Sequence, residues 1–424
     1  MKSAIKELEE KGRAAKAASR KLAFLSTEVK NKALLNIAES IIDKQDEILA
    51  ANKIDYEEAK ASGMSEAMLD RLMLSPSRLE GIAQDTRTVA ALPDPVGEVF
   101  EMRTLPNGLQ ISKRRVPLGV IGAIYESRPN VTIDISSLCL KSGNAVILRG
   151  GKETINSNKA LAKVAQEACA QAGVPQGTIQ LIESTERALV NHMLKMKGII
   201  DLMIPRGGAG LIKLVSENAT MPVLSGGIGV CHTYVDKNAD LNKAVAIAYN
   251  AKVQRPTVCN ALDCILVHNQ IAQAYLPAIA KEWAKAGVEM HCDEQALAIL
   301  KPVPSLRLVP ATDEDWGKEY LSLKAAIKVV NSLDEALKYI EKYGSGHSEA
   351  IVTEDHSTAT RFLNEVDAAC VYANASTRFT DGSQFGLGAE IGISTQKFHA
   401  RGPMALKELT SYKWTILGSG QVRP

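Results

Sequence analysis

Paired cysteines are missing from this sequence. The seven cysteines include no C-x-x-C pair, which excludes a zinc knuckle and a thioredoxin-type redox motif. Their number is odd and they are scattered, so reduced thiols in a cytosolic protein are the simplest expectation. The cysteines are Cys139, Cys169, Cys231, Cys259, Cys264, Cys292 and Cys370.

Long apolar runs and an excess of one charge are also missing. No stretch reaches the apolar length of a membrane helix, and residues 1–26 contain acids and no signal-peptide core. The net charge of +2 argues against a broad nucleic-acid-binding face. The histidines show no metal-ligand spacing, so we assign no metal. We expect a soluble, cytoplasmic protein with neither a membrane nor a nucleic-acid partner.

The sequence does contain a regular alternation of short apolar strands and helices. At 424 residues, two or three domains are expected. Residues 2–92 have mostly helical periodicity. Residues 99–103 and 109–116 are strand-like and flank Pro106-Asn107-Gly108, which is typical of a hairpin turn. This hairpin is polar on much of its surface and could pair with another subunit.

A βαβ series follows the hairpin and indicates a doubly wound parallel sheet. From about residue 222 the second half has its own strand–helix alternation, without a repeat of the sequence itself. The predicted strands are 120–125, 145–148, 179–182, 199–204, 264–267, 304–309, 325–330, 349–353 and 369–373, and the predicted helices are 131–141, 156–172, 185–196, 211–218, 240–249, 270–286 and 333–343.

Two glycine-rich turns follow predicted strands, Arg149-Gly150-Gly151-Lys152 and Arg206-Gly207-Gly208-Ala209-Gly210. Glycine lets backbone N–H groups approach phosphate oxygens, and ligands bind at the carboxyl ends of parallel strands. Neither turn is a G-x-G-x-x-G or Walker motif, so each taken alone also fits an ordinary turn with solvated basic residues. Two such turns in one domain favour a dinucleotide, and the cations Arg149 and Lys152 favour the 2′-phosphate of NADP.

Cys259 stands where a polar loop runs into a buried strand, in AKVQRPTVCNALDCILV (251–267). A thiol at such a junction is reachable by substrate and could be a nucleophile. Free cysteines are more often small core residues, and this alternative holds for Cys259 and for Cys264. The stretch by itself leaves both interpretations open.

Asn130 follows the predicted strand 120–125 and precedes a predicted helix. Its amide could donate a hydrogen bond to an oxyanion. An asparagine in this place more often caps the helix, and the sequence slightly favours the cap.

Long collinear motifs of this chain resemble the gamma-glutamyl phosphate reductase family, also called glutamate-5-semialdehyde dehydrogenases, of the aldehyde dehydrogenase superfamily. The resemblance covers essentially the whole chain. The motifs are VPLGVIGAIYESRPNV (116–131), GNAVILRGGKE (143–153), IPRGGAG (204–210), PVLSGGIGVCHTYVD (222–236), QRPTVCNALDC (254–264) and FGLGAEIGISTQKFHARGPMALKELTSYKW (385–414).

The resemblance implies an aldehyde dehydrogenase-like α/β fold with three parts. These are a Rossmann-like cofactor domain (1–98 and 117–228), an α/β catalytic domain (229–405) and a small oligomerisation element (99–116 and 406–424). It implies a homo-oligomer, either a dimer or a dimer of dimers. The resemblance also suggests association with glutamate 5-kinase as the source of the unstable substrate.

The implied activity is NADPH-dependent reduction of L-glutamyl 5-phosphate to L-glutamate 5-semialdehyde in proline biosynthesis, with release of phosphate through a cysteine thioester. The resemblance makes Cys259 the nucleophile. It makes the side-chain amide of Asn130 a hydrogen-bond donor to the oxyanion. It places Arg149 and Lys152 at the adenosine ribose. It places Arg206, Gly207 and Gly208 at the pyrophosphate, and Glu319 at the nicotinamide ribose.

One segment departs from the hydrolytic members of the superfamily. They carry a glutamate base in an ELGG-like segment, whereas this chain has Val223-Leu224-Ser225-Gly226-Gly227 with no acid. A reductase must keep water away from its thioester, so the loss of the base fits that chemistry. The alternatives are an aldehyde oxidoreductase producing a free acid, a thiol acyltransferase and a non-catalytic protein.

The substrate's own charged groups need partners. We expect Arg128, Ser376 and Arg378 as candidates for the α-carboxylate and Glu126 for the ammonium. Each of the three charged side chains fits a surface ion pair equally well.

Overall fold

The computed structural model describes residues 2–398 and 400–423, and the chain divides into two compact units. Unit 1 comprises Met1–Ser225, Gly386–Gly392 and Met404–Pro424, and unit 2 comprises Gly226–Phe385 and Ile393–Pro403. Within the described residues, no helix combines the length and the apolar character needed to cross a membrane.

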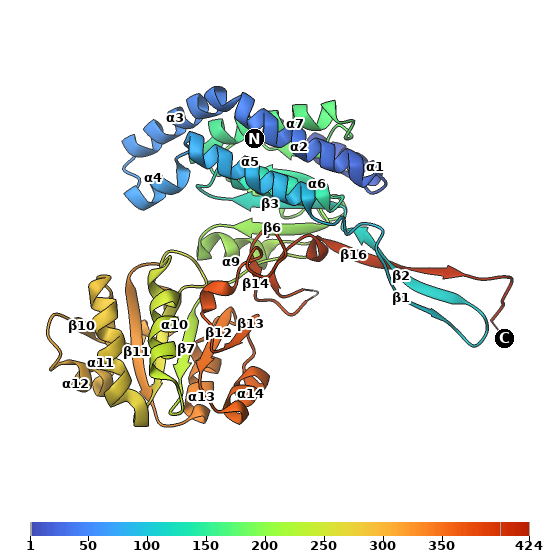
Figure 1. Cartoon of the computed structure of the whole chain (residues 1–424). Helices are drawn as coiled ribbons and strands as arrows, with labels where there is room; N and C mark the ends of the chain where they lie inside the picture. Colours follow the sequence, from blue (N-terminus) through green and yellow to red (C-terminus); the bar gives the residue numbers. More distant parts are fainter. Residues whose placement is uncertain (1, 399, 424) are drawn as a thin grey trace. The chain divides into compact units, whose positions relative to one another are not determined.

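Unit 1 is built on a four-stranded parallel sheet in the order β5-β4-β3-β6 (Figure 1). Its strands are β3 (Val120–Tyr125), β4 (Ala145–Arg149), β5 (Ile179–Leu181) and β6 (Leu202–Arg206). Its helices are α1 (Lys2–Leu22), α2 (Thr27–Asp43), α3 (Gln45–Ala61), α4 (Glu66–Leu72), α5 (Pro76–Ala91), α6 (Val131–Lys141), α7 (Ile155–Gln171), α8 (Ala188–Met193) and α9 (Ala209–Asn218), with short 3₁₀ turns η1 (Lys152–Thr154) and η4 (Lys407–Leu409).

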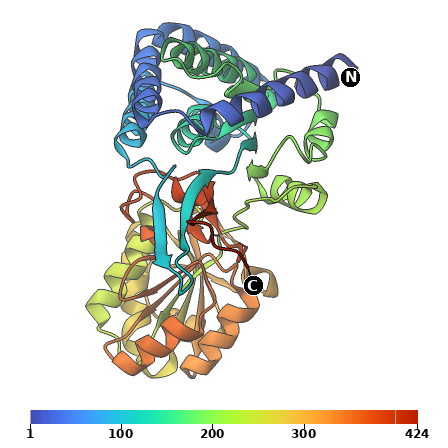
Figure 2. The same ribbon diagram turned by 90° about the vertical axis from the view of Figure 1, so that its right-hand side faces the viewer.

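Helices cover both faces of this sheet. One apolar cluster joins α1, α8 and α9 to alternate residues of β3 and β4. On the other face α6 and α7 pack with α2 and α5, and the blue and green helices of this group lie together in Figure 2. The chain runs from β3 to β4 and β5 and then returns to β6 on the other side of β3. The topological switch point, where ligands bind in open parallel sheets, therefore lies between the ends of β3 and β6.

A three-stranded antiparallel ribbon extends from unit 1 (Figure 1). It consists of β1 (Val99–Thr104), β2 (Gln110–Pro117) and β16 (Thr410–Leu417), paired in the order β1-β2-β16. The predicted hairpin is confirmed, and the C-terminal strand is its third member.

Unit 2 is a seven-stranded parallel sheet in the order β10-β9-β11-β8-β7-β12-β13. One apolar cluster packs α10, α11 and α12 on one face, and another packs α13 and α14 on the other. Its strands are β7 (Cys231–Val235), β8 (Leu262–His268), β9 (Glu289–Cys292), β10 (Arg307–Pro310), β11 (Lys324–Val330), β12 (Ser348–Val352) and β13 (Cys370–Ala373), with a small pair β14 (Ile393–Ser394) and β15 (Gly402–Pro403). Its helices are α10 (Leu241–Val253), α11 (Asn269–Lys285), α12 (Glu294–Leu300), α13 (Leu333–Tyr343) and α14 (His356–Glu365), with 3₁₀ turns η2 (Asp313–Asp315) and η3 (Thr377–Phe379).

The predicted α/β class and parallel sheets are confirmed, and several boundaries differ. The helix expected over 185–196 is only Ala188–Met193, the strand expected over 199–204 is Leu202–Arg206, and the one expected over 304–309 is Arg307–Pro310. The sequence prediction missed α14 because Phe362 is the buried residue on its face, which leaves little apolar periodicity to detect.

Candidate functional site

Cys259 lies in the loop between α10 and β8 and is the partly exposed member of the seven cysteines, since the other six are buried. Cys264, inside β8, packs in the apolar cluster beside Tyr339, and burial raises the pKa of its thiol to about 12. The two thiols of this stretch thus have different surroundings in the structure. Cys264 is the core residue, and Cys259 is the thiol accessible to a small molecule.

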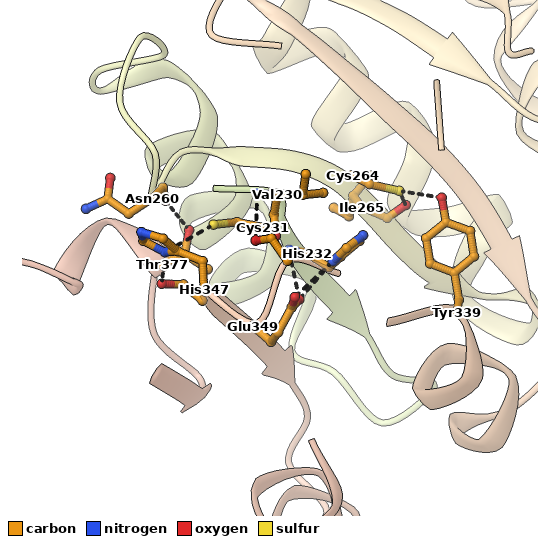
Figure 3. Close-up of polar contacts among 12 residues, drawn as sticks. Val230, Cys231, His232, Asn260, Cys264, Ile265, Tyr339, His347, Glu349 and Thr377 are labelled. Carbon is orange, nitrogen blue, oxygen red and sulfur yellow. Dashed lines mark hydrogen bonds and ion pairs between the residues drawn. The ribbon is translucent and has the colours of Figure 1, made fainter. Parts of the chain in front are cut away.

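Close packing holds the backbone at Cys259. The Sγ of Cys231 donates to the Cys259 carbonyl oxygen at 3.2 Å, and the Thr377 hydroxyl donates to the carbonyl of Asn260 at 2.7 Å (Figure 3). Gly229 packs so closely that a Cβ on it would lie 2.0 Å from the Cys259 oxygen. Position 229 therefore requires glycine, and the loop is fixed on several sides.

A buried polar layer lies at the amino ends of β7 and β12, next to this loop (Figure 3). His232 binds Glu349 through its Nδ1 at 2.9 Å, and Nδ1 of His347 contacts the Ser348 hydroxyl at 2.8 Å. Burial lowers the pKa of His347 to about 4, so this ring is neutral. Burial also raises the pKa of Cys231, which keeps its S–H available as the donor to Cys259. This layer supports the loop and presents no second exposed nucleophile.

Arg378 brings a positive charge to Cys259. Its Nε donates to Oε1 of Gln254 at 2.9 Å, and its Nη1 donates to the side-chain oxygen of Asn260. Burial lowers the pKa of Arg378, and electrostatic interaction with Cys259 acts in the opposite direction. The guanidinium is thus held by two neutral amide oxygens, one of them on Asn260, the residue that follows Cys259. Ser376, predicted with it, is buried and accepts from the Arg378 N–H at 3.3 Å.

Glu319 reaches the same segment from the loop before β11. Its Oε1 accepts from the Gly229 N–H at 2.9 Å. Gly229 also contacts Cys259, so the structure brings this predicted cofactor residue close to the predicted nucleophile.

The segment 223–227, in which the resemblance implied the loss of a general base, is tightly packed. Val223 forms an isolated parallel β-bridge with Met203. A Cβ at Gly226 would lie 2.1 Å from the carbonyl oxygen of Ile393, so that position excludes a side chain. Neither residue supplies a carboxylate.

In unit 1, three cations mark the carboxyl edge of the sheet. Arg149 ends β4 and Arg206 ends β6, on either side of β3. Arg149 is buried and donates from Nη2 to the Thr185 carbonyl at 3.1 Å, while its Nε is buried with no hydrogen-bond partner. Burial lowers the pKa of Arg149. Lys152 is exposed at the start of η1.

The second glycine turn is held by a carboxylate. Gly208 is the N-cap of α9, and its N–H donates to Oε2 of Glu126 at 2.9 Å. A Cβ at Gly207 would lie 2.3 Å from the same oxygen. Glu126, predicted for the substrate ammonium, therefore binds at a helix N-terminus, which attracts anions.

Asn130 does not cap its helix, so the interpretation that the sequence slightly favoured is wrong. Its backbone is already helical, with φ −54° and ψ −31°, and its side chain makes no cap bond. Its Nδ2 instead donates to Oδ2 of Asp134 at 2.7 Å. Arg128, two residues earlier, acts electrostatically on the same carboxyl group.

The residues that the sequence prediction missed are neighbours of the predicted ones. Asp134 carries a local signal, its four-residue spacing from Asn130 on a predicted helix. Gly229 and Cys231 carry none, because they meet Cys259 only through the pairing of β7 with β8. Among the described residues, no group of three metal-ligating side chains comes together.

Comparison with known proteins identifies the family of this chain. The model of the aldehyde dehydrogenase family matches residues 2–298. Gamma-glutamyl phosphate reductase of Dehalococcoides mccartyi is 65% identical over 423 residues, covering 100% of both chains. The enzyme of the same name from Caldanaerobacter subterraneus is 56% identical, covering 98% of this chain and 100% of that one.

Solved structures agree with these matches. The crystal structure of gamma-glutamyl phosphate reductase from Thermotoga maritima has a TM-score of 0.96 and 50% identity, covering 99% of this chain and 100% of that chain. An acetylating aldehyde dehydrogenase from Geobacillus thermoglucosidasius, with a TM-score of 0.72 and 18% identity, shares the fold. The chain belongs to the aldehyde dehydrogenase family and, within it, to the gamma-glutamyl phosphate reductases.

Proposed function

We propose that this chain reduces L-glutamyl 5-phosphate to L-glutamate 5-semialdehyde with NADPH, releasing phosphate, in proline biosynthesis. The observation that carries the proposal is an accessible thiol, Cys259, beside the Arg378 guanidinium, in a chain whose 223–227 segment has no acid. Membership of the reductase family supports the choice of substrate.

Cys259 acts as the nucleophile of this reaction. Its thiolate attacks the acyl carbon, the bond to the phosphate oxygen breaks, and a thioester remains on the enzyme. NADPH, when bound, supplies the hydride that reduces this thioester. The hemithioacetal on Cys259 then releases the aldehyde and regenerates the thiolate. The Asn130 amide and the Cys259 backbone N–H hold the oxyanion in both steps.

The residues at the carboxyl edge of unit 1 fit the cofactor. The buried Nε of Arg149 has no partner in the protein, and an anionic ligand would supply one. Arg149 and Lys152 would hold the adenosine ribose with its 2′-phosphate, and Arg206, Gly207 and Gly208 the pyrophosphate. Glu319 would hold the nicotinamide ribose. Pyrophosphate at Gly208 must displace the Glu126 carboxylate from its N–H.

The glutamyl group is held by its charges. Arg378 is the first candidate for the α-carboxylate because its hydrogen bonds go to two neutral amide oxygens. Ser376 and Arg128 are the other candidates for binding the α-carboxylate. The Glu126 carboxylate binds the ammonium group of the substrate once its hydrogen bond with the Gly208 N–H is broken.

An assay of nicotinamide reduction tests the function. With glutamate 5-semialdehyde and NADP⁺, we expect activity only when inorganic phosphate is present, because phosphate must cleave the thioester. Product analysis should find the acyl phosphate, or the hydroxamate formed from it with hydroxylamine. Phosphate-independent formation of glutamate would instead show a hydrolytic aldehyde dehydrogenase. The absence of any nicotinamide reduction would contradict the proposal altogether.

Replacing Lys152 by alanine should weaken the binding of NADPH more than the binding of NADH. Losing one charge-assisted contact to the 2′-phosphate costs about 1.5–3 kcal/mol, which is roughly a 10- to 100-fold rise in the KM for NADPH. The KM for NADH, which lacks this phosphate, should change by less than about 2-fold. Lys163→Ala, at an exposed lysine of α7, is the matched control. Equal losses with both cofactors would remove Lys152 from this role.

Replacing Arg378 by glutamine should separate charged from uncharged substrates. The KM for glutamate semialdehyde should rise roughly 10- to 100-fold through loss of a charge-assisted bond. An uncharged aldehyde such as butanal lacks the carboxylate, so its KM should stay nearly constant. A parallel rise for both aldehydes would show that Arg378 does not bind the carboxylate.

The ribbon β1-β2-β16 is the proposed oligomerisation element. It exposes Met102, Trp414, Ile416 and Leu417, and Lys113 Nζ lies 4.6 Å from the Tyr412 ring centre. Apolar side chains exposed on a protruding ribbon favour a second copy as partner, giving a homodimer or a dimer of dimers.

We assign the functional domains as 1–98 with 117–228 for the cofactor, 229–405 for catalysis and 99–116 with 406–424 for assembly, in a cytoplasmic enzyme. We also propose that this enzyme associates with glutamate 5-kinase.

A further inference from the structure

Asn130 and Asp134 form a side-chain pair at the start of α6. Asn130 stands just before the helix and Asp134 lies one turn further, on the same face. The Asn130 Nδ2 donates to the Asp134 Oδ2 at 2.7 Å. The Asn130 side chain makes no cap bond. The contact therefore orients one amide group without closing the helix end.

The donor and acceptor ends of a carboxamide can exchange places unless a neighbouring group fixes its orientation. Rotation by a half-turn exchanges its NH₂ donor for its carbonyl acceptor. An ionised carboxylate only accepts hydrogen bonds, so it binds the NH₂ side and repels the carbonyl oxygen. With one N–H bound to Asp134, the second N–H of the same nitrogen is left to donate elsewhere. A carbonyl oxygen in that place would repel a developing oxyanion.

The charges around Asp134 define the conditions under which it is a pure acceptor. Burial raises the pKa of Asp134 to about 7, Asp85 on α5 adds to the rise, and Arg206 and Arg128 oppose it. At a pH about one unit or more above this value the carboxylate predominates. Assays at about pH 8 therefore examine the accepting form.

We propose that Asp134 is a positioning residue for the reaction, whose carboxylate fixes the Asn130 amide with its NH₂ group oriented to donate to the oxyanion. The inference rests on the proposed function, which assigns the oxyanion bond to Asn130. Asp134 itself touches neither the substrate nor the reacting atoms. Its effect should pass entirely through Asn130.

A double-mutant cycle tests this proposal. Asp134→Leu should lower kcat about 10-fold or more, which is less than the roughly 10²- to 10³-fold loss expected for removing the donor itself in Asn130→Ala. KM for the semialdehyde and Kd for NADPH should change by less than about 3-fold, because the lost interaction forms in the transition state. Asp134→Asn, whose carbonyl oxygen still accepts, should recover part of kcat. In the Asn130→Ala background, Asp134→Leu should have no further effect.

Asp85→Asn is the matched control. Asp85 acts on Asp134 electrostatically, but the Asn130 amide donates to Asp134, so kcat at about pH 8 should be unchanged. Should Asp134→Leu fail to fold, Asp134→Ser, with a side chain too short to reach Asn130, replaces it. A kcat loss in Asn130→Ala together with wild-type kcat in the Asp134 variant overturns the inference and leaves the proposed function standing. Wild-type kcat in Asn130→Ala overturns the oxyanion role, and the inference with it. Additive losses in the double variant also overturn the inference.

Discussion

Replacing Cys259 by alanine is expected to lower turnover by at least about 10⁴-fold, because no other group can form the thioester once the nucleophile is lost. NADPH binding should remain within about 2-fold of the wild type, since the proposed cofactor cations belong to unit 1 and lie outside the Cys259 loop. The measurements are the nicotinamide assay and NADPH fluorescence titration. A variant that keeps its turnover would remove Cys259 from the mechanism.

Cys264→Ala is the matched control for this experiment. It deletes a thiol only five positions away, but that thiol lies in the core, where burial raises its pKa to about 12. We expect wild-type kcat with a modest loss of thermal stability. Iodoacetamide should block the wild type and the Cys264 variant alike and should fail to label the Cys259 variant at the active site. Iodoacetamide labelling of the Cys259→Ala protein at another cysteine, at the wild-type rate, would reveal a different reactive thiol.

Replacing Asn130 by alanine is expected to lower kcat about 10²- to 10³-fold, the usual cost of losing one oxyanion donor. The structure adds a second expectation about stability. An asparagine that caps a helix contributes about 1 kcal/mol to folding. Asn130 makes no cap bond, but its amide donates to the Asp134 carboxylate, so the variant should lose about 1–3 kcal/mol through that bond and nothing through a cap. The measurements are steady-state kinetics and thermal unfolding on the same preparation.

A true cap provides the contrast. Asp240 precedes α10, and its Oδ1 accepts from the Lys243 N–H at 2.9 Å. Asp240→Ala should lose about 1 kcal/mol of stability while kcat stays nearly constant. If Asn130→Ala behaved like Asp240→Ala, with lower stability and unchanged kcat, Asn130 would be a structural residue only.

The Cys259 loop shows why the missing base matters chemically. A thioester survives until hydride arrives only if no carboxylate activates water beside it. In this chain, Val223 offers an apolar side chain, and position 226 has no room for a side chain because the Ile393 carbonyl fills the space. The departure from hydrolytic relatives is thus built into the packing as well as into the residue types.

Local pattern alone predicted a large part of the fold. The helix at Val131–Lys141 and the helix at Leu333–Tyr343 were predicted with their observed limits, because an apolar face repeats every three to four residues within each. The parallel sheets follow from the alternation of such helices with short apolar strands. The boundaries of α8 and β10 were wrong, because periodicity within an element indicates its type and says little about where it ends.

The candidate site was predicted only in outline. The sequence by itself determined the family, the class of fold and the position of Cys259 before a buried strand, since these depend on residue types and short spacings. Tertiary structure added the measured contrast between the two thiols, a partly exposed Cys259 and a buried Cys264. It also decided that Arg378 lies beside Cys259, that Glu126 binds Gly208 and that Asn130 binds Asp134 instead of capping α6. The physical reason is that side-chain contacts are decided by packing, often between residues about a hundred positions apart, and a pattern that repeats every two to four residues carries no information about them.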